Sequence, residues 1–291
     1  MLHPRREDLA YSSGGAAAAR QTSSTMLDID FAQVTDPGRS RDHNEDYIGF
    51  VSPETDARVR SHGWLFALAD GVGGHDKGEV ASREAVETVL SGFRKAPGGE
   101  PHAGLLTRLV QAANIRVYET GRAASAGGTN MATTIVTCAV RFDRAVIAHV
   151  GDSRCYLIRH GHIKQLTRDH TVVNDQVRLG LLTAKEAAEN KNRHLLSRSV
   201  GPDLFVSVDI TDTQVLPGDS LLLCSDGFYG SMPEAQIGNI VNNNEDAKLA
   251  AAKLVQLANE LDGGDNISVQ LVRIRNVERM GMYRGRPYKL R

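Results

Sequence analysis

Short apolar runs, several of them rich in β-branched residues, alternate along the chain with longer segments in which apolar residues recur at helical spacing. The runs predict strands, because buried strands are short and favour these residues, over 64–69, 133–140, 144–150, 153–158, 205–210, 220–224 and 266–274. The helical spacing predicts helices over 78–95, 104–122 and 246–261. Thr183, with Glu186 three residues later, indicates a capping box that opens a shorter helix.

The order of these elements favours a layered α+β domain. Two helices follow each other, and then several strands crowd into residues 133–166. The turns between those strands fall at Asp143-Arg144, Gly151-Asp152 and His160-Gly161. Such turns are too short for the crossover that parallel neighbours need, so we expect an antiparallel sheet.

Both ends of the chain differ from this middle part. Residues 1–26 are rich in Ser, Gly and Ala and predict a flexible leader. Residues 276–291 form a basic C-terminal tail, which either contacts an acidic partner or is a solvated end. Arg5 and Arg6 are not followed by the apolar stretch of an export signal, and no apolar run approaches the ~18 residues of a membrane helix. We therefore expect a cytoplasmic protein that does not enter membranes.

Composition limits the function classes. The 291 residues suffice for one large domain or two small ones, and 41% hydrophobic residues can supply a core. With 34 Lys and Arg against 35 Asp and Glu, the formal charge is −1, which argues against a protein that coats nucleic acid or an anionic membrane. Cys138, Cys155 and Cys224 are scattered, which predicts buried free thiols in a reducing compartment.

Four aspartates stand at strand ends, where apolar segments give way to polar residues. Asp70, Asp152 and Asp226 end apolar strands, and Asp265 precedes one. Each alone is explained by a turn, since Asp-Gly is a strong turn signal. Together, if the strands pack side by side, the carboxylates would share one space and repel. A divalent cation with oxygen ligands, Mg²⁺ or Mn²⁺, would compensate them, whereas no zinc-type Cys/His spacing is present.

A second charged cluster, residues 41–46, follows the turn signal at Asp36-Pro37-Gly38. It is either a solvated loop or a functional group of side chains. In the functional interpretation Arg41 binds a phosphate with two hydrogen bonds, and Glu45 and Asp46 are two more metal-facing carboxylates. An anion clamp beside a metal site indicates phosphoryl chemistry.

Five motifs now occur in a fixed order: RxxNED at 41–46, ADGVGGHxxGExAS at 69–82, HVGDSR at 149–154, CSDG at 224–227 and GDNISV at 264–269. Together they resemble the PP2C-type (PPM) metal-dependent serine/threonine protein phosphatases, in particular the compact bacterial members. The resemblance spans residues 28–275, and we place the phosphatase domain at 27–275. It implies a four-layer αββα sandwich with two central antiparallel β-sheets.

The resemblance also implies roles for individual residues. Asp70 matches the metal-bridging aspartate, and Gly71 matches a ligand that binds through its carbonyl. The resemblance places the other metal-binding positions at Asp226 and Asp265 for the first metal, Glu45 and Asp46 for the second, and Asp152 with Asp226 for a third. Two or three Mn²⁺ or Mg²⁺ ions per chain follow. Arg41 matches the phosphate-binding arginine. A metal-activated water then attacks phosphorus, and no phosphoenzyme forms.

The sequence departs from the family in two places. Many eukaryotic members have a histidine, proposed as general acid, where this chain has Val72; His75 is the alternative here, although a role in helix entry explains it equally well. The family often has glycine at the position of Ala132, so a positive φ there would strain this chain. Residues 168–200 stand where related enzymes have a mobile flap beside the site, or they form an ordinary helical excursion.

These observations predict an enzyme that hydrolyses phosphoserine and phosphothreonine in proteins. Two alternatives are a pseudophosphatase, which is a regulatory binding module on the same fold, and a phosphoesterase for small molecules. The family implies phosphoprotein partners, including a serine/threonine kinase and its targets. We expect a monomer.

Overall fold

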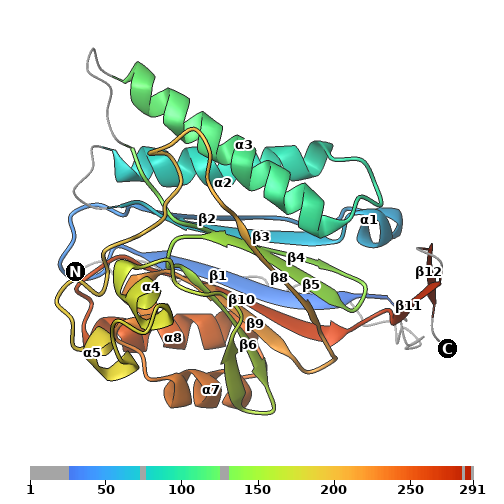
Figure 1. Ribbon diagram of the computed structural model, residues 1–291. Coiled ribbons are helices and arrows are strands. Elements are labelled where there is room, and N and C mark those ends of the chain that lie inside the picture. Colours follow the sequence, from blue (N-terminus) through green and yellow to red (C-terminus); the bar gives the residue numbers. More distant parts are fainter. Residues whose placement is uncertain (1–25, 73–76, 125–130, 284–285, 290–291) are drawn as a thin grey trace, which may run out of the picture.

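The computed structural model describes residues 26–72, 77–124, 131–283 and 286–289. Two five-stranded antiparallel sheets lie face to face, and helices cover the outer face of each (Figure 1). One sheet has the order β2 (Asp46–Val51), β3 (Trp64–Asp70), β4 (Ile135–Arg141), β5 (Arg144–Val150) and β8 (Asp209–Gln214). The other has the order β1 (Asp28–Asp36), β10 (Ile267–Asn276), β9 (Ser220–Cys224), β6 (Arg154–Arg159) and β7 (His162–Gln165).

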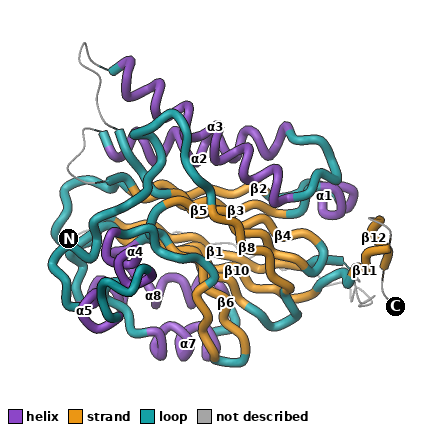
Figure 2. Tube along the Cα trace, viewed as in Figure 1, coloured by secondary structure: helices purple, strands orange, loops and turns teal. Residues whose placement is uncertain are grey.

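The helices form the two outer layers (Figure 2). The first sheet carries α2 (Gly78–Lys95) and α3 (His102–Ala123), and the second carries α7 (Glu234–Asn243) and α8 (Ala247–Leu261). The short helices are α1 (Asp56–Ser61), α4 (Val172–Arg178), α5 (Ala184–Ala188) and α6 (Asp226–Tyr229). The predicted four-layer αββα sandwich is therefore confirmed.

Continuous apolar strands produce this layering because both of their faces are buried. On β3, Phe66 and Leu68 belong to the core between the sheets, whereas Leu65 and Ala67 pack toward α2 and α3. Successive side chains of a strand point to opposite faces, so one apolar run serves two cores. β9 divides in the same way: Leu221 and Leu223 lie between the sheets, and Leu222 and Cys224 lie under α8.

Most predicted elements are present, and the differences have local reasons. The strand predicted over 205–210 is wrong in its position, because β8 begins only at Asp209. The preceding backbone bonds to α3 instead: the Asn114 amide donates to the carbonyls of Asp203 and Leu204, and Val206 N–H donates to Gln111. β1 and β2 were not predicted, whereas β7 follows the predicted turn at His160-Gly161 and lies within the group of strands expected over 133–166. The capping box at Thr183 and Glu186 opens α5 as expected.

The predicted leader, except Met26, lies outside the described residues. The basic tail contains two short strands that the sequence did not indicate, β11 (Met280–Tyr283) paired with β12 (Arg286–Lys289). All three cysteines are buried and free. In the part of the chain that the structure describes, no helix has the length and apolar character needed to cross a membrane.

Candidate active site

The strand-end carboxylates gather at one end of the sandwich, the end at which α4 and α5 lie (Figure 1). They surround an open pocket of about 530 Å³. The charged side chains that line it come from five separate segments and are Arg41, Glu45, Asp70, Asp152, Asp226 and Asp265. The structure thus brings together residues that the sequence spreads over more than two hundred positions.

Pairing of β2 with β3 positions the first carboxylates. Asp46 and Asp70 are direct partners in this antiparallel pair. Beyond Asp70 the chain must pass very close to its neighbours: a Cβ on Gly71 would lie 2.5 Å from the Gly78 carbonyl oxygen and 2.9 Å from that of Glu45. Gly71 N–H also donates to the Glu45 carbonyl over 3.1 Å. Only glycine allows this approach.

The second sheet supplies the next two carboxylates. Cys224 on β9 is paired with Val269 on β10, so Asp226 after β9 and Asp265 before β10 reach the same edge. Asn266 then ties this edge to the other sheet, because its Oδ1 accepts the Glu45 N–H over 2.8 Å. Its Nδ2 donates to the carbonyls of Pro37 and His43, each over 2.9 Å. Sequence reasoning missed Asn266, although an amide directly before a buried strand is an unusual position.

Asp152 lies on the connection between the two sheets. It follows Gly151, whose φ of +102° is strained for any other residue and whose position against Thr134 leaves no room for a Cβ. Asp152 is only 4% exposed. The connection from β5 to β6 therefore holds a carboxylate inside the molecule, facing the pocket.

Burial and mutual repulsion raise the free energy of the charged form of these carboxylates in the folded chain. Burial first, and then the charges of Asp46 and Asp226, raise the pKa of Asp70 well above its ordinary value. Burial likewise raises the pKa of Asp46 to about 7 and that of Asp152 to about 7. Ser225 Oγ donates to Asp46 Oδ2 over 2.8 Å, but Oδ1 is buried without a hydrogen-bond partner among the described residues. This orphaned oxygen and the all-oxygen donor set fit a divalent cation.

Arg41 lies at the rim of the pocket. Its Nη2 donates to Asp265 Oδ2 over 2.9 Å, and 48% of its side chain is exposed. The charge of Asp265 raises the pKa of Arg41 above its ordinary value. The exposed part of the guanidinium can reach an anion in the pocket while Asp265 holds the arginine in place.

Residues 168–200, the flap, contain α4 and α5 and cover one side of the pocket with His194, Leu195, Leu196 and Ser199. An isolated antiparallel β-bridge between Thr171 and Leu196 joins the two ends of this segment. His194 Nδ1 lies 3.6 Å from Asp226 Oδ2. Sequence reasoning noted the polar character of this segment but assigned no role to His194.

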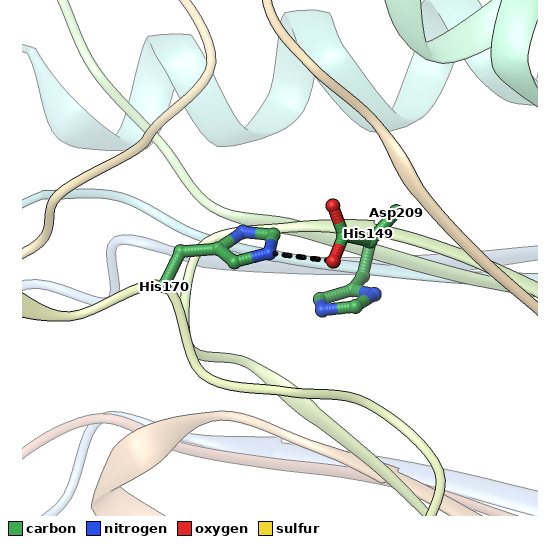
Figure 3. A group of neighbouring side chains, drawn as sticks. All are labelled: His149, His170 and Asp209. Atoms are coloured by element: carbon green, nitrogen blue, oxygen red, sulfur yellow. Dashed lines mark ion pairs between the residues drawn. The ribbon is translucent and has the colours of Figure 1, made fainter. Parts of the chain in front are cut away.

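A second group, His149, His170 and Asp209, attaches the flap to the sandwich (Figure 3). The imidazoles are stacked with centroids 4.7 Å apart, and His170 Nε2 lies 3.3 Å from Asp209 Oδ2. Gly151 N–H donates to His170 Nδ1. Burial lowers the pKa of His170 to about 4, so the ring is neutral at pH 7.

This second group is poorly suited to a cation. Arg168 and Arg198 already pair with Asp209, at 3.0 and 2.7 Å. Two guanidinium charges compensate the carboxylate and repel a metal ion. The group therefore supports the turn that carries Asp152 and contributes no second metal centre.

Three sequence expectations have separate outcomes. His75 lies outside the described residues. Ala132 does not adopt a positive φ, so the expected strain is absent, and its carbonyl accepts the Val72 N–H over 3.0 Å. Cys224 is fully buried in the core under α8, and burial raises the pKa of its thiol, so it is no nucleophile.

Comparison with known proteins gives one consistent family. The family model described as Protein phosphatase 2C matches residues 39–263. The chain is 34% identical over 257 residues to a serine/threonine phosphatase stp of Listeria innocua, covering 87% of this chain and 96% of that protein. A Streptococcus agalactiae serine/threonine phosphatase structure is similar with a TM-score of 0.77 and 31% identity, covering 84% of this chain and 99% of that one. The catalytic domain of the phosphatase PstP, in complex with 2 manganese ions, has a TM-score of 0.72 and 30% identity over 86% of this chain and 100% of its own.

Proposed function

Because the chain belongs to the protein phosphatase 2C family and is a protein serine/threonine phosphatase, we propose that it hydrolyses phosphoserine and phosphothreonine through a metal-dependent attack by water. One observation carries this proposal: carboxylates from both sheets line one pocket, and the buried Asp46, which pairs with Asp70 across β2 and β3, has an oxygen without a hydrogen-bond partner among the described residues. Phosphoproteins, including a serine/threonine kinase and its targets, are the proposed substrates.

We assign the metal ligands from the geometry and the resemblance together. Asp70, the Gly71 carbonyl, Asp226 and Asp265 hold the first cation, and Glu45 and Asp46 hold or order the shell of the second. Asp152 and Asp226 hold a third. When bound, Mn²⁺ or Mg²⁺ supplies Lewis acidity and an activated water, so the protein needs no nucleophile of its own.

Arg41 binds the substrate phosphate in this assignment. Its guanidinium lies on the pocket rim and is held by Asp265. Two parallel N–H groups can contact two phosphate oxygens and stabilise the charge that builds up on them during in-line displacement.

His75 is proposed as the proton donor to the serine or threonine oxygen, on sequence grounds. A serine alkoxide is a poor leaving group and needs a proton more than an aryl oxide does. We expect His75→Ala to lower turnover of a phosphothreonine peptide more than turnover of an aryl phosphate. Steady-state assays of both substrates check this, and equal losses would remove His75 from the acid role.

The proposed function is tested with purified protein and a phosphothreonine peptide. We expect phosphate release in Mn²⁺, its loss in EDTA and its return when Mn²⁺ is restored. Calorimetric titration with Mn²⁺ should show binding; a chain that binds no divalent cation and releases no phosphate would instead be a regulatory module. Faster hydrolysis of phosphorylated sugars or nucleotides than of phosphopeptides would contradict the protein substrate.

A further inference from the structure

A second cavity, which we call the distal cavity, lies at the end of β2 that is remote from the catalytic pocket. It has a volume of about 570 Å³, which is within the roughly 300–1,000 Å³ of ligand sites in proteins. Figure 1 shows α1, which contributes to it, at the opposite end of the sheets from α4 and α5. None of the proposed catalytic or metal-binding residues lines this cavity. Its lining consists of Phe50, Val51, Ser52, Glu54, Arg58 and Arg94.

The two arginines of the distal cavity have no anionic partner within the protein. Among the described residues, the guanidinium groups of Arg58 and Arg94 make no ion pair and no hydrogen bond, and both side chains are exposed. Arg60, two residues further along α1, is by contrast paired with Glu278 at 3.1 Å. Glu54 lines the same cavity yet pairs with neither arginine. Two uncompensated cations around one opening attract an anion from solution.

Hydrogen bonds fix the two helices that carry these arginines relative to each other. Gly99 N–H donates to the Ser61 carbonyl over 2.8 Å, and His62 Nε2 donates to the Ala96 carbonyl over 2.9 Å. These bonds join the end of α1 to the residues that directly follow α2. The backbones that carry the two guanidinium groups therefore keep a constant separation. A preorganised site of this kind loses less entropy when it binds a ligand.

The lining of the distal cavity suits a phosphate group better than a single carboxylate. Guanidinium groups bind phosphate oxygens through paired N–H donors, and two of them match the charge of a phosphate dianion. The hydroxyl of Ser52 supplies a further donor. Phe50 and Val51 add an apolar wall that can contact the carbon atoms of a phosphorylated side chain. The carboxylate of Glu54 repels every anion and therefore keeps the binding weak and reversible.

We propose that the distal cavity binds a second phosphoryl group of a protein substrate while the first is hydrolysed in the catalytic pocket. This inference rests on the proposed function for the nature of the substrate. β2 begins at Asp46, next to Glu45 of the catalytic pocket, and ends at Val51, which lines the distal cavity. The five strand steps from 46 to 51, at about 3.3 Å each, place the two sites roughly 17 Å apart. An extended peptide with phosphorylated residues about eight positions apart is long enough to reach both.

Binding is tested on the full chain in Mg²⁺, with inorganic phosphate as the probe and amide chemical shifts in NMR as the readout. In the wild type we expect the amides over 50–58 and 92–96 to shift together along one binding curve. Phosphate in the catalytic pocket is followed separately through the amides over 41–46.

Four variants show whether the charges of the distal cavity cause this binding. Arg58→Ala and Arg94→Ala should each weaken it about fivefold or more. Glu54→Gln should strengthen it, because the substitution removes a repulsive charge. Lys95→Ala is the control: it removes a positive charge from the last turn of α2, as Arg94→Ala does, but Lys95 does not line the cavity. Lys95→Ala should match the wild type.

Peptide kinetics test whether the phosphate comes from a substrate. One peptide carries a phosphothreonine and, about eight positions before or after it, a non-hydrolysable phosphonate analogue of phosphoserine. The reference peptide has serine at that second position. In the wild type we expect the phosphonate peptide to have a KM about fivefold lower than the reference. The ratio of the two KM values should fall toward one in Arg58→Ala and stay at the wild-type value in Lys95→Ala.

The contrary results are separate for each claim. Unshifted amides over 50–58 and 92–96, or an equal loss of affinity in Lys95→Ala, would overturn the proposal, because the arginines would then act only as general surface charge. Binding of inorganic phosphate together with equal KM values for the two peptides would overturn the substrate role, because the cavity would then hold free phosphate only. If no peptide is hydrolysed while the distal cavity still binds phosphate, the proposed function fails instead.

Discussion

Replacing Asp226 by alanine is expected to abolish phosphatase activity while leaving the fold intact. Asp226 lines the pocket together with Asp70, Asp152 and Asp265. In the proposed assignment it holds both the first and the third cation, so its loss would remove a ligand from each. Lewis-acid stabilisation by a metal ion is worth several kcal/mol in the transition state, so we expect kcat/KM for a phosphothreonine peptide to fall on the order of 10³-fold.

A neighbouring carboxylate provides the control for this experiment. Asp262 lies on the adjoining rim with Asp226 and Asp265 but does not line the main pocket. Asp262→Ala removes the same charge and should change kcat/KM less than about threefold. A charge on the rim affects the rate at which substrate associates more than the rate of the chemical step. Circular dichroism and thermal unfolding show whether Asp226→Ala is folded. A folded Asp226→Ala variant with nearly full activity would contradict the ligand assignment.

The sequence located correctly those strands of the sandwich that are buried on both faces. Runs such as 64–69 and 220–224 are apolar at every position, and each supplies two cores. β8 reads DITDTQ, with one apolar residue, and its burial alternates between half-buried and exposed positions. Such an edge strand is stabilised by its antiparallel pairing with β5 rather than by burial of its own side chains. That pairing is a tertiary property, which the local pattern does not contain.

For the site, the sequence located the carboxylates but not their supports. Asp-Gly pairs at strand ends and the five motifs pointed to Asp70, Asp226 and Asp265 directly. Asn266 and Ser225 act through hydrogen bonds to residues about 180 or more positions away, namely Glu45 and Asp46. His194 reaches Asp226 only because the flap folds back on the Gly151 turn. Contacts of this kind depend on the sheet register and on loop closure, which no window of sequence shows.

The largest effect on stability is expected from Asp70→Asn, and its sign should invert when metal is added. Burial, with the charges of Asp46 and Asp226 next, raises the pKa of Asp70 in the folded chain. A raised folded pKa means that the unfolded chain binds fewer protons, so this contribution to stability is present below about pH 4 and is lost as pH rises toward the folded value. Near pH 7 without metal, the charged carboxylate therefore destabilises the fold.

Asparagine keeps the shape of the side chain and removes the charge. The backbone of residue 70 keeps its own bonds, since its N–H donates to Thr134 Oγ1 and its carbonyl accepts from Thr133 Oγ1. In EDTA at pH 7 we expect Asp70→Asn to be more stable than the wild type, and the difference to shrink toward pH 4. His102 and His170, whose lowered pKa values give the opposite pH slope, are present in both proteins and cancel in the comparison.

Saturating Mn²⁺ should reverse the order of the two melting temperatures. A ligand at about 100 times its dissociation constant stabilises the protein that binds it by about 2.7 kcal/mol, and only the wild type keeps the Asp70 carboxylate. Asp203→Asn, at an exposed position away from the pocket lining, should follow the wild type in both conditions. Thermal unfolding from pH 4 to 7.5, with EDTA and with Mn²⁺, measures all three proteins. If Asp70→Asn is the less stable protein in EDTA at pH 7, repulsion among the buried carboxylates does not govern the stability of the metal-free fold.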